Sequence, residues 1–116
     1  MNDESWFAAR LLMASEHPGE SFAAPLFEEK IILVRAPTED AAREKAQRLG
    51  TSFEEDFLND EGKPVHWAFR EVLDLKVLFD DTFEDGTEVY YALLDQDDVT
   101  HIRRSLRADH QVASIR

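Results

Sequence analysis

Four histidines are the residues of this chain best suited to acid–base or metal chemistry. They are His17, His66, His101 and His110. No H-x-x-x-H or H-E-x-x-H spacing places two imidazoles on one helix face, so the sequence offers no paired metal ligands. His66 has the most suggestive context, because it alternates with Trp67 on an expected strand where Glu71 or Asp74 could approach it. We expect surface or loop positions for the histidines and keep a catalytic use of His66 as an alternative.

The densest group of carboxylates lies between residues 80 and 88. It comprises Asp80, Asp81, Glu84, Asp85 and Glu88. Hard cations such as Ca²⁺ bind carboxylate oxygens of this kind, but the spacing does not fit an EF-hand loop. Asp85-Gly86 is also a common turn sequence. We therefore expect a solvated hairpin end rather than a metal site, and metal binding stays the alternative.

The motifs of nucleophilic and nucleotide-dependent catalysis are missing from the sequence. The chain has no cysteine, which excludes a thiolate nucleophile, a disulfide and a Cys-rich zinc site. None of its serines stands in a Gly-x-Ser-x-Gly elbow, and its four glycines are too far apart to form a phosphate-binding loop. The sequence therefore predicts a non-enzymatic protein without a cofactor.

Aromatic side chains are the remaining candidates for a site, because they often line pockets and anchor interfaces. Core packing is the competing interpretation for each of them. Tyr90 and Tyr91 are adjacent, so on a strand one would face the core and the other an outer surface or a partner. The possible ligand or interface residues are Trp6, His66, Trp67, Glu71, Tyr90 and Tyr91.

Size and charge limit the class of protein. A chain of 116 residues, 43% of them hydrophobic, fits one globular domain over residues 1–116. Its net charge of −12 opposes binding to nucleic acid or to an anionic membrane. The first residues lack the basic region of a secretion signal and no long apolar run follows, so we expect a cytoplasmic protein.

Charge is divided unequally along the chain. Residues 1–98 carry 24 acids and 9 bases, a charge of −15. Residues 99–116 carry four arginines and one aspartate, a charge of +3. Opposite charges of this kind allow the tail to fold back on the body or to reach a neighbouring subunit, and a loose tail is the third alternative, because chain termini are often loose.

The elements that would position these residues begin with two strands and a helix. Residues 6–14 form an apolar run that predicts a strand covered on both faces, and residues 27–36 are β-branched at their centre, as in a central strand. A helix is expected over residues 39–50, with Thr38 as its N-cap and Gly50 as the residue that ends it.

Three further strands are expected to complete the sheet. Residues 53–58 predict a short strand, and the turn sequence at 59–64 predicts a hairpin. Residues 65–79 alternate between apolar and polar types, with a slip that predicts a β-bulge at residues 71–73. A last strand is expected over residues 89–94, after the turn at Asp85-Gly86.

A second helix follows the sheet and completes the expected fold. Val99, Ile102 and Leu106 form its apolar stripe, with Asp97 or Asp98 as the N-cap. The predicted fold class is α+β, an antiparallel sheet of about five strands with one long helix packed on it, in the order β-β-α-β-β-β, and a short C-terminal helix. The core of this fold spans residues 6–94, and residues 95–116 form the C-terminal helix and the basic tail.

Several local motifs occur together in an order that resembles a known family. They are Trp6-Phe7-Ala8, the strand over residues 31–36, the Glu- and Ala-rich helix, Val65-His66-Trp67-Ala68-Phe69, Glu71-Val72-Leu73-Asp74, and Asp85-Gly86-Thr87-Glu88-Val89-Tyr90. Together they resemble the bacterial family catalogued as domain of unknown function 4288, over roughly residues 6–94. The resemblance implies a single bacterial domain with an antiparallel sheet and one long helix, and it carries over no catalytic residues.

Three hypotheses of function follow. The leading one is a non-enzymatic protein-interaction or self-associating module, a homodimer in which a second copy buries the apolar sheet face that one alanine-rich helix leaves open. The second is an acidic immunity or inhibitor-type protein that binds a basic partner. The third is a small enzyme or ligand-binding protein with a pocket near His66, Glu71 and Tyr90.

Overall fold

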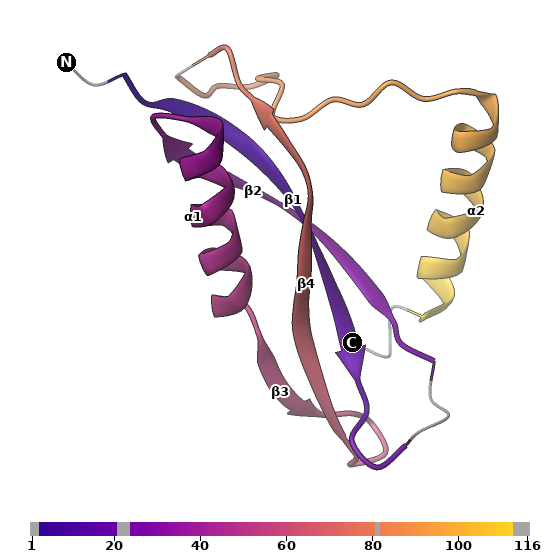
Figure 1. Cartoon of the computed structure of the whole chain (residues 1–116). Coiled ribbons are helices and arrows are strands. Elements are labelled where there is room, and N and C mark those ends of the chain that lie inside the picture. Colours follow the sequence, from indigo (N-terminus) through magenta and orange to yellow (C-terminus); the bar gives the residue numbers. More distant parts are fainter. Residues whose placement is uncertain (1–2, 21–23, 81, 113–116) are drawn as a thin grey trace.

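The fold is an antiparallel four-stranded sheet with one helix on each side of it (Figure 1). The structure is a computed structural model that describes residues 3–20, 24–80 and 82–112, with side chains up to residue 106. The elements are β1 (Ser5–Glu16), β2 (Phe27–Ala36), α1 (Glu39–Ser52), β3 (Glu55–Leu58), β4 (Pro64–Val77) and α2 (Gln96–Val112). The strand order is β2-β1-β4-β3. The α+β class and the antiparallel sheet predicted from sequence are confirmed.

The hydrophobic core lies between α1 and one face of the central strand β1. Phe7, Ala9 and Leu11 of β1 point to this face, because alternate residues of a strand share a face. Val34 and Ala36 of β2 extend the same layer. From the helix, the only side chains buried in the core are alanines 42 and 46. These short side chains let the helix approach the sheet closely, and the strands supply most of the apolar surface.

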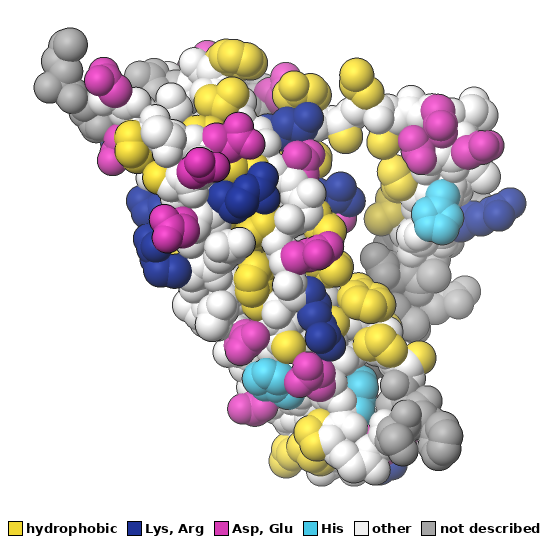
Figure 2. Space-filling model, in the orientation of Figure 1, with side chains coloured by type: hydrophobic (Ala, Val, Ile, Leu, Met, Phe, Trp, Pro, Cys, Tyr) yellow, Lys and Arg dark blue, Asp and Glu magenta, His cyan; other side chains and the backbone are white. Residues whose placement is uncertain are grey.

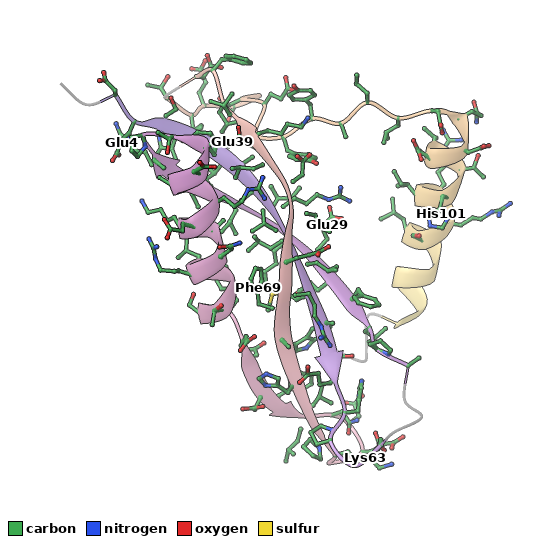
Figure 3. All side chains as sticks on the ribbon, viewed as in Figure 1. Glu4, Glu29, Glu39, Lys63, Phe69 and His101 are labelled. Atoms are coloured by element: carbon green, nitrogen blue, oxygen red, sulfur yellow. The ribbon has the colours of Figure 1, made fainter. Side chains whose placement is uncertain are left out.

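Helix α1 begins as predicted and ends later than predicted. Thr38 is the N-cap, with its side-chain oxygen accepting a hydrogen bond of 3.1 Å from the N–H of Ala41. Gly50 does not end the helix, which continues to Ser52 and is capped by Phe53. Gly50 is buried against Phe69 of β4, whose side chain reaches toward α1 in Figure 3, and a Cβ at this position would overlap the ring. Close packing, not a turn, explains the glycine.

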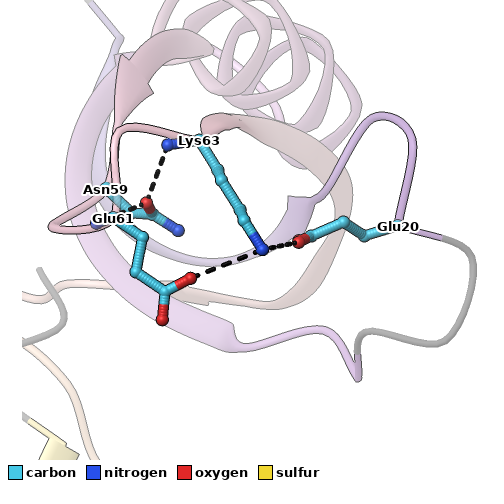
Figure 4. Close-up of polar contacts among 4 residues, drawn as sticks. All are labelled: Glu20, Asn59, Glu61 and Lys63. Atoms are coloured by element: carbon cyan, nitrogen blue, oxygen red, sulfur yellow. Dashed lines mark hydrogen bonds and ion pairs between the residues drawn. The ribbon is translucent and has the colours of Figure 1, made fainter.

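The turn between β3 and β4 confirms the predicted hairpin. The side-chain oxygen of Asn59 accepts 3.0 Å hydrogen bonds from the N–H groups of Glu61 and Lys63. Gly62 adopts a φ of 75°, a conformation that residues with a Cβ avoid. The Nζ of Lys63 lies 2.8 Å from Glu20 and 3.4 Å from Glu61, so it links this turn to the loop after β1 (Figure 4).

Strand β4 contains two bulges where one was predicted. Its pairing with β1 skips Leu73 and Arg70, because Arg10 and Leu11 pair with Asp74 and Val72, and Leu12 and Met13 pair with Glu71 and Phe69. The bulge at Leu73 lies in the predicted interval, and the one at Arg70 was not expected. The bulges restore the alternation of faces, so that Phe69, Val72 and Leu75 all pack against the core.

The expected fifth strand and the short C-terminal helix are corrected by the structure. Residues 89–94 have no regular strand structure, because Tyr90 crosses the face of the sheet to bond Asp74 instead of lying along the edge of β4. The edge N–H of Phe69 is bonded instead by the carboxylate of Glu54 at 2.8 Å. The order is therefore β-β-α-β-β-α, the strand expected over residues 53–58 begins at Glu55, and α2, with 17 residues, is longer than α1.

Candidate functional site

The side of the sheet opposite α1, here called the open face, is not covered by a packed helix. The alternate residues of the three long strands build it. They are Trp6, Ala8, Arg10, Leu12 and Ala14 of β1, Phe27, Glu29, Ile31, Leu33 and Arg35 of β2, and Ala68, Glu71, Asp74 and Lys76 of β4. In Figure 3, Glu29 lies on the side of the sheet toward α2, away from α1. This face combines a charged centre with apolar positions along β2.

The segment after β4 covers one end of the open face. The ring of Phe83 packs edge-on against Trp6, with 5.6 Å between the ring centroids. The Nζ of Lys76 lies 4.6 Å from the centre of the Tyr91 ring, within the range of a cation–π contact. Both contacts lie at the end of the sheet that contains Trp6. The segment after β4 therefore does not cover the middle or the other end of the open face.

A polar network of four side chains lies at the margin of this covered part. Arg10 donates to Glu29 at 2.6 Å, and the hydroxyl of Tyr90 donates to the Oδ2 of Asp74 at 2.9 Å. Asp74 also accepts the N–H of Leu75 at 2.8 Å. Each carboxylate in the network thus has a donor, and the network fixes the segment around Tyr90 to the sheet.

The network shifts the pKa values of its members. The hydrogen bond from Tyr90 lowers the pKa of Asp74, because it stabilises the carboxylate. Burial, followed by the bond to Asp74, raises the pKa of Tyr90. The bond to Glu29 raises the pKa of Arg10, whose Nε is buried without a hydrogen-bond partner among the described residues. All three groups therefore keep their ordinary charge states near neutral pH, as a structural network would.

The uncovered part of the open face exposes large apolar side chains. Phe27 and Ile31 are 61% and 44% exposed, although both are strand residues of a type that favours burial. Leu33, on the same face of β2, is exposed as well. Between this face and α2 lies a cleft of about 470 Å³, lined by Arg10, Asp74, Lys76 and Tyr90 on one side and by Asp98, His101 and Ile102 on the other. Hydrophobic side chains are visible on both sides of the gap in Figure 2.

Helix α2 stands apart from the sheet with its own apolar stripe exposed. It packs against no strand, and not against α1, within the part of the chain that the structure describes. Ile102 and Leu106 are 42% and 58% exposed. The start of the helix is fixed by local bonds, since Asp95 and Asp98 each accept the other's backbone N–H, at 2.8 and 3.1 Å. This is a capping box, and it makes Asp95 the N-cap in place of the predicted Asp97 or Asp98.

The structure separates the residues that the sequence suggested for a ligand pocket. His66 lies 2.7 Å from Asp56 of β3 and pairs in register with Glu16. Tyr90 is bonded to Asp74, whose partner on β1 is Arg10. Glu16 and Arg10 are six residues apart along β1, a distance of about 20 Å. His66 and Tyr90 therefore do not share a site.

The other suggested residues divide between core and surface. Trp67 is buried, on the α1 side of the sheet, where it pairs in register with Ser15. Glu71 is exposed in the middle of the open face. Trp6 and Tyr91 make the contacts with Phe83 and Lys76 described above. Four of the six suggested residues thus belong to the open face or its cover, namely Trp6, Glu71, Tyr90 and Tyr91.

The sequence did not indicate one polar pair, which is formed by Ser15 and His17. The hydroxyl of buried Ser15 lies 2.9 Å from the Nε2 of His17 and accepts the N–H of Leu26 at 2.8 Å. The adjoining cavity, lined mainly by Phe57, Trp67 and other large side chains, measures about 40 Å³, far below the size of a substrate pocket. The pair ties the end of β1 to the chain before β2. The only sequence signal is a Ser-x-His spacing that is common by chance.

Neither a metal centre nor a membrane span is found in the parts of the chain that the structure describes. No group of three or more His, Asp or Glu side chains in residues 3–20, 24–80 and 82–106 could hold a metal ion. None of the described helices is long and apolar enough to cross a membrane. The open face, with its apolar positions on β2 and the facing stripe of α2, is therefore the strongest candidate for a functional surface.

Comparison with known proteins identifies a family but no activity. No curated protein and no solved structure was found to match the chain. A family profile described as a domain of unknown function (DUF4288) matches residues 6–91. The match runs from the second residue of β1 to Tyr91, so it includes the open face and its cover and leaves out α2. The resemblance inferred from the sequence motifs is confirmed: the chain belongs to the DUF4288 family.

Proposed function

We propose that the chain is a self-associating protein-interaction module whose contact surface is the open face of the sheet. The observation that carries the proposal is the row of exposed apolar side chains on β2, Phe27, Ile31 and Leu33, on a face that no helix covers. Isolated exposed apolar residues are ordinary, but three on one face of one strand, interrupted only by Glu29, are typical of an interaction site. A second copy of the chain is the partner that fits, because each copy offers the same uncovered face.

The energetic reason for association is removal of this apolar surface from water. Burial of a large aliphatic or aromatic side chain contributes about 1.5–3 kcal/mol. Three such side chains on each of two copies, each roughly half exposed, contribute part of the free energy that must exceed the cost of bringing two chains together, about 4–15 kcal/mol, and the rest of the buried surface supplies the remainder. The expected result is a dimer that forms at micromolar concentration rather than an obligate assembly.

Analytical ultracentrifugation of the full chain tests the proposal. We expect the wild type to sediment as a dimer at micromolar concentration. Ile31→Lys should raise the dissociation constant by a factor of about 30 or more, because it buries an unpaired charge in the contact. Leu58→Lys is the matched control, since Leu58 is 69% exposed at the hairpin end of β3, three strands away from β2.

Neither Ile31 nor Leu58 belongs to the core, so we expect both variants to remain folded. Circular dichroism of each variant checks this. A wild-type chain that stays monomeric at micromolar concentration would contradict the proposal. So would an Ile31→Lys variant that dimerises as tightly as Leu58→Lys.

A further inference from the structure

We infer that the helix α2 of one copy docks on the open face of a second copy, so that the dimer exchanges its C-terminal helices. This inference rests on the proposed function and names the element that covers the exposed face. Among the described residues, the open face and the apolar stripe of α2 both expose large apolar side chains to solvent. Each would be buried by the other if the two copies were related by a two-fold axis, as in most homodimers.

The connection to α2 holds the helix away from its own sheet. Tyr90 and Tyr91 anchor the chain to the open face through Asp74 and Lys76. The chain then leaves the sheet, and Leu93 is 93% exposed within this connection. Figure 1 shows it running in extended form from the end of the sheet to α2.

Local bonds also set the direction in which α2 starts. The capping box of Asp95 and Asp98 closes the first turn, and Leu94 and Val99 occupy the two positions of a hydrophobic staple. These signals act without any contribution from the sheet. The first turn of the helix therefore needs no contact with the sheet, and the apolar stripe stays available to another copy.

Charge favours the same pairing. Arg103 and Arg104 lie on α2 next to the apolar stripe, in the part of the sequence that carries +3. Glu71, exposed on the open face, forms no ion pair with any residue that the structure describes. A helix that brings arginines to a body of charge −15 is attracted to it, and Glu71 is the carboxylate of the open face that these arginines can pair with.

The area is also sufficient. A helix of 17 residues is about 25 Å long and about 10 Å wide. Two exchanged helices, counted with the sheet surfaces beneath them, bury about 1,000 Å², the area that a specific interface needs. A single helix closing on its own sheet would bury half of that and leave no contact between copies.

Cysteine cross-linking in the full chain tests the exchange directly, because the chain has no cysteine of its own. One protein carries Ile31→Cys on the open face and a second, isotope-labelled protein carries Ile102→Cys on α2. The two are mixed, allowed to re-equilibrate and treated with a short bismaleimide, and mass spectrometry identifies the linked pairs. Gln47→Cys, on the exposed side of α1, replaces Ile31→Cys in the control mixture.

We expect a link between Ile31→Cys and Ile102→Cys of different copies at least ten times more abundant than the link in the control mixture. A wild-type dimer without this excess would overturn the exchange and leave the proposed function intact. Links formed only between two Ile31→Cys chains, or only between two Ile102→Cys chains, would also overturn the exchange and leave the proposed function intact. A wild-type monomer, in which a double variant links only within one chain, would overturn both proposals in favour of closure of α2 on its own sheet.

Discussion

At the scale of single residues, Gly50 shows how a distant contact can reverse the usual effect of a substitution. Within an exposed helix, replacing glycine by alanine stabilises a protein by about 1 kcal/mol. At Gly50 the added methyl group would enter the ring of Phe69. Because overpacking costs about 1–3 kcal/mol, we expect Gly50→Ala to lower the free energy of unfolding.

Urea unfolding of Gly50→Ala, compared with Gln47→Ala in the preceding turn of the same helix, measures this effect. The control removes an exposed side chain and should change stability by less than about 0.5 kcal/mol. Combining Gly50→Ala with Phe69→Leu should cost less than the sum of the two single changes, because the smaller side chain makes room. A stabilised Gly50→Ala variant would show that the helix and β4 are not in this close contact.

The bond between Tyr90 and Asp74 predicts a dependence of stability on pH. Asp74 has a lowered pKa in the fold, so it binds fewer protons folded than unfolded, and its contribution is lost as the pH falls below about 4. Tyr90 has a raised pKa, so its contribution is lost as the pH rises above about 10. The bond therefore stabilises the fold across the whole interval between these limits.

Tyr90→Phe removes the hydroxyl and should cost about 1 kcal/mol near neutral pH, since Asp74 is partly exposed and water screens the bond. The difference from wild type should shrink at both ends of the pH range in a series of urea unfolding curves. Tyr91→Phe is the control, because its hydroxyl forms no hydrogen bond with the described residues, and it should show no such dependence. A difference that stays constant from acid to alkaline pH would contradict the bond.

At the scale of elements, the sequence predicted those whose signals are local. The bounds of β2, the N-cap at Thr38 and the turn at Asn59 match the structure, since each follows from neighbouring residues. The fifth strand, expected because an apolar and aromatic run follows the turn at Asp85-Gly86, is absent, and Tyr90 of that run instead donates to a carboxylate 16 positions away. No local pattern contains that information.

The candidate site was also predicted only in part, because only some of its residues carry a local signal in the sequence. Trp6 and Tyr90 were suggested because aromatic side chains mark surfaces and pockets. Ile31 and Leu33 could not be recognised, because the continuous apolar run of β2 does not reveal which of its faces α1 covers. The stripe of α2 was visible from its spacing, but its separation from the sheet depends on the chain between Tyr91 and Asp95, which has no periodic pattern.

At the scale of the whole molecule, one chain is too extended to be a closed unit. Its radius of gyration is 16.9 Å and its longest dimension 53 Å. A compact domain of this length has a radius of gyration of about 13 Å. Part of this length comes from the sheet, since the 14 residues of β4 span about 46 Å. Helix α2 adds to it, because it packs against no strand in the described part of the chain, and the core between α1 and the sheet is complete without it. The core and the helix that we propose to join two copies are therefore different parts of the chain.

A chain truncated after Leu94 tests this separation. We expect it to remain monomeric at micromolar concentration in the ultracentrifuge, because it lacks the helix that joins the two copies in the proposed dimer. At a concentration low enough that the full chain is also monomeric, its melting temperature should lie within about 4 °C of the full chain, since no core contact is lost. Leu11→Ala in the full chain is the comparison, because this fully buried residue should cost about 2–5 kcal/mol. A truncated chain as unstable as Leu11→Ala would show that α2 belongs to the core of its own copy.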